Sequence, residues 1–196
     1  MKNYSISLPS YSIGDNVYDK ICEICLPFGK KAICIGGKTA ISNVKDLIIE
    51  ACCGSELEIL DFLWYGGDAT YENVKKLEEN ELVKKADIIF GIGGGKALDT
   101  AKALAFKTGK NIFTFPTIAS NCAGTTAVSI MYNDDGSFKE PFFFTAPPRH
   151  CFIYTPVIAK SPAMIGTVPM YDAIGYLEGL CGRVSAIHMQ SILKPR

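Results

Sequence analysis

Short apolar runs alternate with amphipathic segments along the first 115 residues of the chain. Buried strands are predicted over residues 31–35, 57–64, 87–91 and 111–115, which are apolar runs bounded by turn residues. Helices with their apolar positions on one face are predicted over residues 16–28, 39–53, 71–85 and from 96 onward. This alternation predicts an α/β fold, in which a parallel sheet is covered by helices on both faces.

A different pattern begins after residue 116. Two apolar runs, 126–132 and 138–144, flank a polar turn sequence and predict a β-hairpin. Further strands are predicted over 151–154 and, at an edge of the sheet, over 4–8. From residue 161 onward the spacing of the apolar residues becomes helical.

The glycine-rich sequence from Gly91 to Lys102 lies between a predicted strand and a predicted helix. Such a turn presents bare backbone N–H groups at the positive end of a helix, where a phosphate group binds. A tight turn that needs glycine for its dihedral angles is the alternative interpretation. Because Lys96 follows the last glycine directly, the spacing fits neither the Rossmann fingerprint nor the P-loop. These residues alone therefore predict an anion site of unspecified ligand.

Turn residues also follow the other predicted strands, at 36–37, 65–68 and 116–117. The carboxyl ends of parallel strands meet at one edge of a sheet, and ligands bind there. We therefore expect a nucleotide site at this edge.

Composition narrows the class of partner. The 196 residues carry 20 basic and 20 acidic side chains, so the formal net charge is zero, and no basic cluster points to nucleic acid. No apolar stretch approaches the roughly 20 residues of a membrane helix, and residues 1–10 contain no signal-peptide core. We expect a cytoplasmic protein without a nucleic-acid or membrane partner.

Most of the eight cysteines lie in apolar runs, which predicts free thiols buried as small hydrophobic groups. Cys22 and Cys25 have the spacing of a metal knuckle. Because no second pair completes four ligands, packing is the preferred interpretation.

Three segments, taken together, resemble the metal-dependent (iron-type) alcohol dehydrogenases, in their glycerol dehydrogenase-like branch. These segments are 93–102, 115–120 continued by 129–136, and 171–175 with Glu178 after it. The resemblance implies a dinucleotide-binding domain over residues 1–159. Residues 160–196 would form the first helix of an all-helical second domain that carries the metal and the substrate.

The resemblance also implies a site for NAD or NADP. The glycine turn and the following lysine would lie at the pyrophosphate, two hydroxyl residues would contact the nucleotide, and three residues would border the nicotinamide. Asp99, one turn further along the helix, belongs to the same set. In chain order the implied residues are Gly93, Gly94, Gly95, Lys96, Asp99, Thr117, Ser120, Thr126, Val128 and Tyr132.

By the same resemblance, Asp172 would hold a catalytic zinc or iron ion together with two histidines. The metal would act as a Lewis acid and stabilise the alkoxide, so that hydride can leave for the nicotinamide. A solvated helix carboxylate is the alternative for Asp172. The family's ligand histidines lie beyond residue 196, and His150 and His188 are expected to be surface or packing residues. We therefore expect this chain alone to have little or no activity.

Two positions depart from the glycerol dehydrogenase pattern. Cys122 stands where those enzymes carry a substrate-binding aspartate, and it resembles the hydroxycarboxylate dehydrogenase branch, whose substrates are 2-oxo and 2-hydroxy acids. Simple packing in a loop is the alternative. The sequence Gly36-Gly37-Lys38 offers no acidic residue for the adenosine ribose, so NAD and NADP both stay open.

The expected function is that of an NAD(P)-dependent oxidoreductase acting on the CH–OH group of a small alcohol, polyol or 2-hydroxy acid. A small-molecule substrate is the expected partner, and a homo-oligomer is left open. Two alternatives are a non-catalytic nucleotide-binding remnant and a lyase of the related dehydroquinate synthase-like fold.

Overall fold

The computed structural model describes residues 9–161 of the chain. Its strands are β1 Ser10–Gly14, β2 Lys31–Gly36, β3 Glu58–Trp64, β4 Ile88–Gly93, β5 Asn111–Pro116, β6 Val128–Tyr132, β7 Phe138–Phe143 and β8 His150–Tyr154. Its helices are α1 Ile21–Cys25, α2 Lys38–Cys52, α3 Tyr71–Glu78, α4 Glu81–Lys85, α5 Gly95–Thr108 and α6 Thr155–Ala159, with 3-10 turns η1 Val17–Lys20 and η2 Leu26–Phe28.

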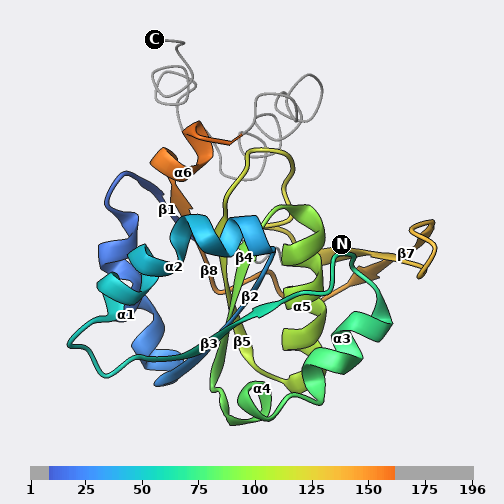
Figure 1. The fold of residues 1–196 in the computed structure, drawn as a ribbon, viewed down its shortest axis with the longest axis horizontal. Coiled ribbons are helices and arrows are strands. Elements are labelled where there is room, and N and C mark those ends of the chain that lie inside the picture. The colour runs from blue at the N-terminus through green and yellow to red at the C-terminus, as the bar shows by residue number, and fades with distance from the viewer. Residues whose placement is uncertain (1–8, 162–196) are drawn as a thin grey trace, which may run out of the picture.

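Six strands form one sheet in the order β1-β8-β5-β4-β2-β3, and every neighbouring pair is parallel. β6 and β7 form a separate antiparallel pair, which extends to one side of the main sheet (Figure 1). The predicted parallel sheet and the predicted hairpin are both confirmed.

Successive side chains of a strand point to opposite faces of the sheet, and β2 shows how this divides the core. Ala32 and Cys34 pack with η1, α1 and α2, whereas Ile33 and Ile35 pack with α3, α4 and α5. Figure 1 shows these two groups of helices on opposite sides of the sheet. The sheet is therefore covered on both faces, as its apolar strands require.

Two predicted helices are each divided in the structure. The segment predicted over 16–28 forms η1, α1 and η2, and Pro27, which lacks an N–H donor, lies in the last of these turns. The segment predicted over 71–85 breaks into α3 and α4 at Asn80. The Asn80 side chain accepts hydrogen bonds from the N–H groups of Leu82 (2.8 Å) and Val83 (3.4 Å), and so it caps a new helix.

The predictions for the two ends of the chain fall largely outside the described residues. The strand predicted over 4–8 lies there, and the strand at this edge of the described sheet is β1, which the sequence analysis did not predict. The helix predicted from residue 161 onward also lies outside the described residues, apart from its first residue. The predicted domain boundary, between residues 159 and 160, lies at their border. Between residues 9 and 161, no helix combines the length and the apolar character needed to cross a bilayer.

Candidate functional site

The carboxyl ends of β2, β4 and β5 lie side by side at the upper edge of the sheet in Figure 1. β2 leads through Gly37 into α2, and β4 leads through Gly94 into α5. The two turns touch, because a Cβ at Gly93 would lie 3.5 Å from the Cβ of Ala40 in α2. Two helix N-termini therefore converge on one place.

Both helices begin with free backbone donors. No side chain of the described residues caps α2 or α5. The first N–H groups of an uncapped helix lack partners inside the helix, and the helix dipole makes this end positive. The arrangement favours an anion at the edge of the sheet.

The glycines of the 93–95 turn are also required by the packing around them. Gly93 has a φ of +136°, a conformation that side chains rarely adopt. A Cβ at Gly94 would lie 2.6 Å from Cδ1 of Ile118, and one at Gly95 would lie 2.3 Å from Nδ2 of Asn121. The loop after β5 thus packs against the turn, which supports the interpretation that the turn needs glycine, while the anion site stays a prediction.

Lys96 places a cation beside this turn. Its Nζ donates a hydrogen bond of 2.7 Å to Oδ2 of Asp68 and lies 4.6 Å from the centre of the Tyr132 ring. The hydrogen bond to Asp68 raises the pKa of Lys96, so its ammonium stays protonated. The lysine side chain is 46% exposed, and so an incoming anion can reach it. Sequence reasoning found no partner for Lys96, and the only signal for one was that Asp68 follows β3 at the same edge.

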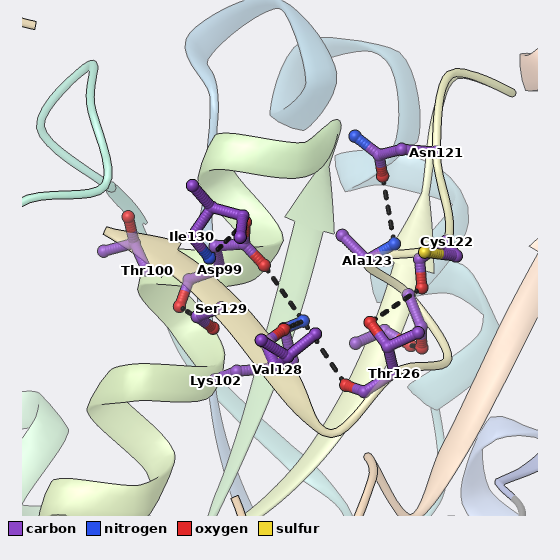
Figure 2. A network of polar contacts seen from close by, with 12 residues as sticks. Asp99, Thr100, Lys102, Asn121, Cys122, Ala123, Thr126, Val128, Ser129 and Ile130 are labelled. Carbon is purple, nitrogen blue, oxygen red and sulfur yellow. Dashed lines mark hydrogen bonds and ion pairs between the residues drawn. The ribbon is translucent and has the colours of Figure 1, made fainter. Parts of the chain in front are cut away.

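Asp99 lies deeper, in a buried pair with Lys102 (Figure 2). Asp99 Oδ1 is 2.9 Å from Nζ of Lys102, and Oδ2 accepts a hydrogen bond from the Ile130 N–H (3.2 Å). Burial raises the pKa of Asp99 and lowers that of Lys102. The lysine also donates to the carbonyl oxygens of Thr126 (3.4 Å) and Val128. Here Asp99 joins α5 to the hairpin, while its role toward a cofactor stays a prediction.

The loop from 117 to 127 carries the remaining predicted residues. The Thr117 N–H donates to the Gly93 carbonyl (3.2 Å), which fixes the start of the loop on the glycine turn. Ser120 and Cys122 are half-buried. The Cys122 carbonyl accepts hydrogen bonds from the hydroxyls of Thr125 (3.2 Å) and Thr126 (3.1 Å) (Figure 2). The glycine turn, Lys96, Thr117 and Tyr132 thus lie together at one edge of the sheet, whereas Thr126 and Val128 meet the Asp99–Lys102 pair; the roles of all these residues toward a cofactor stay predictions.

The described residues do not supply a metal site. Asp172 and His188 lie outside residues 9–161. Within that range no group of three or more His, Cys, Asp or Glu side chains is placed to hold an ion. His150 begins β8, at the opposite edge of the sheet from the glycine turn, and packs against Phe152. It has the packing role expected of it, and the ligand role of Asp172 stays a prediction.

Comparison with known proteins gives the same picture. The family described as iron-containing alcohol dehydrogenase matches residues 9–151. A glycerol dehydrogenase of Thermotoga maritima is 38% identical over 110 residues, which cover 56% of this chain and 30% of that protein. A glycerol dehydrogenase of Escherichia coli is 28% identical over 181 residues, which cover 91% of this chain and 49% of that protein.

A solved structure agrees with these matches. The structure of a probable glycerol dehydrogenase from Sinorhizobium meliloti superimposes with a TM-score of 0.73 at 26% identity, covering 83% of this chain and 44% of that one. The chain thus spans half or less of the length of these relatives. The resemblance seen in the sequence is confirmed, and the chain belongs to the iron-containing alcohol dehydrogenase family.

Proposed function

We propose that this chain carries the dinucleotide-binding part of an NAD(P)-dependent oxidoreductase that acts on the CH–OH group of a small alcohol, polyol or 2-hydroxy acid. The observation that carries the proposal is the uncapped start of α5, where the glycine turn lies beside the half-exposed ammonium of Lys96. Relatives named glycerol dehydrogenase and glycolaldehyde reductase support this class of reaction.

The chemistry at this edge suits a diphosphate. Backbone N–H groups donate hydrogen bonds without a side chain between them and the ligand, so phosphate oxygens can approach the turn closely. Lys96 adds a full positive charge, which its pairing with Asp68 keeps in place. The chain's own contribution is therefore to bind the pyrophosphate and to orient the dinucleotide across the carboxyl ends of the strands.

Lys38 bears on the choice between NAD and NADP. It is the first residue of α2, and its Nζ lies 4.7 Å from the centre of the Trp64 ring at the end of β3. A carboxylate that accepts the ribose hydroxyls favours NAD at this position in dinucleotide-binding folds, whereas a cation accommodates a 2′-phosphate. Lys38 therefore supports binding of NADP alongside NAD.

A zinc or iron ion belongs to the proposal only for the whole enzyme. The metal would polarise the substrate oxygen as a Lewis acid. Asp172 would be one of its ligands, and residues 9–161 supply no group of three or more His, Cys, Asp or Glu side chains to hold it.

Nucleotide binding tests the proposal directly. Titration of the chain with NADH and with NADPH, followed by fluorescence, is expected to give a saturable signal with at least one of them. Gly94→Val is expected to abolish the signal, because a side chain would fill the space where the phosphates meet the backbone. A folded wild-type chain that binds neither nucleotide would refute the proposal.

Because Gly94→Val also crowds Ile118, a second variant is needed that leaves the turn intact. Lys96→Ala is expected to weaken binding about tenfold, which corresponds to about 1.4 kcal/mol. Lys107→Ala is the matched control, because Lys107 lies near the other end of α5, is 48% exposed and is paired with Glu78 at 2.7 Å. Equal nucleotide affinities in the two variants would show that Lys96 does not contribute to binding.

A further inference from the structure

Four cysteines lie close together where α1 and α2 pack on β2. Cys25, Cys34 and Cys52 are buried in one apolar cluster, and Cys22 packs against it, half-buried. Cys22 and Cys25 belong to α1, Cys34 to β2, and Cys52 is the last residue of α2. The two cysteines of the Cys-x-x-Cys sequence in α1 thus lie in different environments. Cys25 is in the core, and Cys22 is at its border.

The Cys22 thiol is fixed against the end of α2. Its Sγ lies 3.4 Å from the carbonyl oxygen of Ala51 and 3.2 Å from Oγ of Ser55. The Ser55 hydroxyl in turn donates to the carbonyl of Cys52 at 2.8 Å. The thiol of Cys22 therefore contacts residues on either side of Cys52.

The two thiols also affect each other. Burial, followed by the charge and hydrogen-bonding contact of the Cys22 thiol, raises the pKa of Cys52 to about 12. The Cys22 and Cys52 thiols are therefore neighbours at the end of α2, and they belong to two elements that the chain separates by β2.

A small reagent can reach Cys22 from the surface, because this residue is only half-buried. Cys52 is 6% exposed and lines an open cavity together with Cys53, Lys45, Leu57 and Phe62. By contrast, Cys25 and Cys34 are fully buried. Cys22 is therefore the more accessible thiol of the pair.

We propose that Cys22 and Cys52 are a modification site that closes to a reversible disulfide on oxidation by a peroxide. The Cys22 thiol reacts first: its sulfur takes one peroxide oxygen, the O–O bond breaks, and water or an alcohol leaves, giving a sulfenic acid. The Cys52 sulfur then attacks the Cys22 sulfur, the S–O bond breaks, and water leaves with the Cys52 proton. Two thiols lose two electrons, and the peroxide gains them.

The disulfide would tie α1 to the C-terminal end of α2 and enclose the strand between them. Closing a loop of about 30 residues restricts the unfolded chain more than the folded one, so the oxidised protein is expected to melt about 5–10 °C higher. This proposal does not depend on the proposed function, since neither cysteine lies at the glycine turn.

The test uses the 196-residue chain, fully reduced and then treated with hydrogen peroxide. Free thiols are alkylated before digestion, and the peptides are identified by mass spectrometry. The expected product is an intramolecular crosslink between Cys22 and Cys52, with two titratable thiols lost and a higher melting temperature. A dithiol reductant is expected to reverse all three changes.

Variants distinguish this pair from its neighbours. Cys22→Ser and Cys52→Ser are each expected to abolish the crosslink and the thermal shift, whereas Cys53→Ser is expected to keep both. Identification of the crosslinked peptides in the wild-type chain tests the proposal even where a variant folds poorly. A crosslink through Cys25 or Cys53, covalent dimers, or Cys22 oxidised to a sulfinic acid beside a free Cys52 would overturn the proposal.

Discussion

The imidazole of His150 lies between two serine hydroxyls at the start of β8. Its Nδ1 is 2.7 Å from Oγ of Ser10, and its Nε2 is 2.9 Å from Oγ of Ser12. Because the Ser10 hydroxyl donates its proton to the Arg149 carbonyl (2.8 Å), Ser10 must accept from Nδ1–H. In the neutral ring Ser12 then donates to Nε2, and protonation would require the Ser12 hydroxyl to turn and accept from Nε2–H instead.

His150 should therefore make stability depend on pH. Burial lowers the pKa of His150 in the folded protein, while the unfolded chain keeps the ordinary value of about 6.5. Below that pH the unfolded state binds the proton more readily, so stability is lost as the pH falls through 6.5 toward the lower folded pKa. The melting temperature of the wild-type chain should fall between pH 8 and pH 5.

His150→Asn is the matched variant for this pH dependence, because its side-chain amide can still donate to Ser10 without titrating. Its melting temperature is expected to fall a few degrees less than that of the wild-type chain over the same range. Identical slopes for the two proteins would show that His150 does not contribute. Because His188 is present in both proteins, any contribution it makes to the pH dependence is the same in each.

Among the elements, α5 is the one on which the site depends. Its N-terminus forms the glycine turn, and its middle carries the Asp99–Lys102 pair that holds the hairpin through the carbonyls of β6 and the loop before it. A buried ion pair adds little stability by itself, but removing one partner leaves an uncompensated charge. The pair therefore fixes how the hairpin sits on the helix.

Lys102→Met is expected to destabilise the chain by about 3–5 kcal/mol, because Asp99 then lacks its cation in a buried place. Urea denaturation provides the measurement. Lys107→Met on the exposed side of the same helix is the control and should cost less than about 1 kcal/mol. The double variant Asp99→Asn with Lys102→Met should recover part of the loss. Similar free energies of unfolding for the two lysine variants would contradict this account.

The sequence predicted the strands of the main sheet within a few residues, apart from the edge strand β1, because a strand buried on both faces has to be a short apolar run. Helix breaks were harder to predict. The amphipathic pattern continues through Asn80 although the helix breaks there. Only the geometry of the Asn80 side chain shows that it caps α4. Helix caps depend on local hydrogen bonds that a spacing of apolar residues does not report.

At the scale of the whole molecule, the sequence predicted that the turns after the strands meet at one edge of the sheet, but it did not show the pairings between residues there. Asp99 and Lys102 are three residues apart on a helix, so their pairing was accessible from the motif. Lys96 and Asp68 are 28 residues apart and meet only because β3 and β4 end at the same edge. Such a contact follows from the topology, which a pattern of residue types does not specify.

We predict that substrate choice in the whole enzyme depends on Cys122. From its place in the family pattern, we expect the holoenzyme to prefer 2-oxobutanoate to glycerol in steady-state kinetics. Cys122→Asp should lower kcat/KM for the 2-oxo acid about tenfold or more, because a carboxylate in a half-buried loop repels an anionic substrate. Cys122→Ser is the control of similar size. A wild-type preference for glycerol would assign Cys122 to packing.

The pairing of β1 with β8 has a consequence for how the molecule is made. These strands join in register from Ser10 with His150 to Gly14 with Tyr154, and 140 residues separate the partners. At ribosomal rates, the first strand to emerge waits on the order of ten seconds for the last one. During this interval the nascent chain exposes an unsatisfied strand, so we infer that completion of the sheet is a late event that follows synthesis of residue 154.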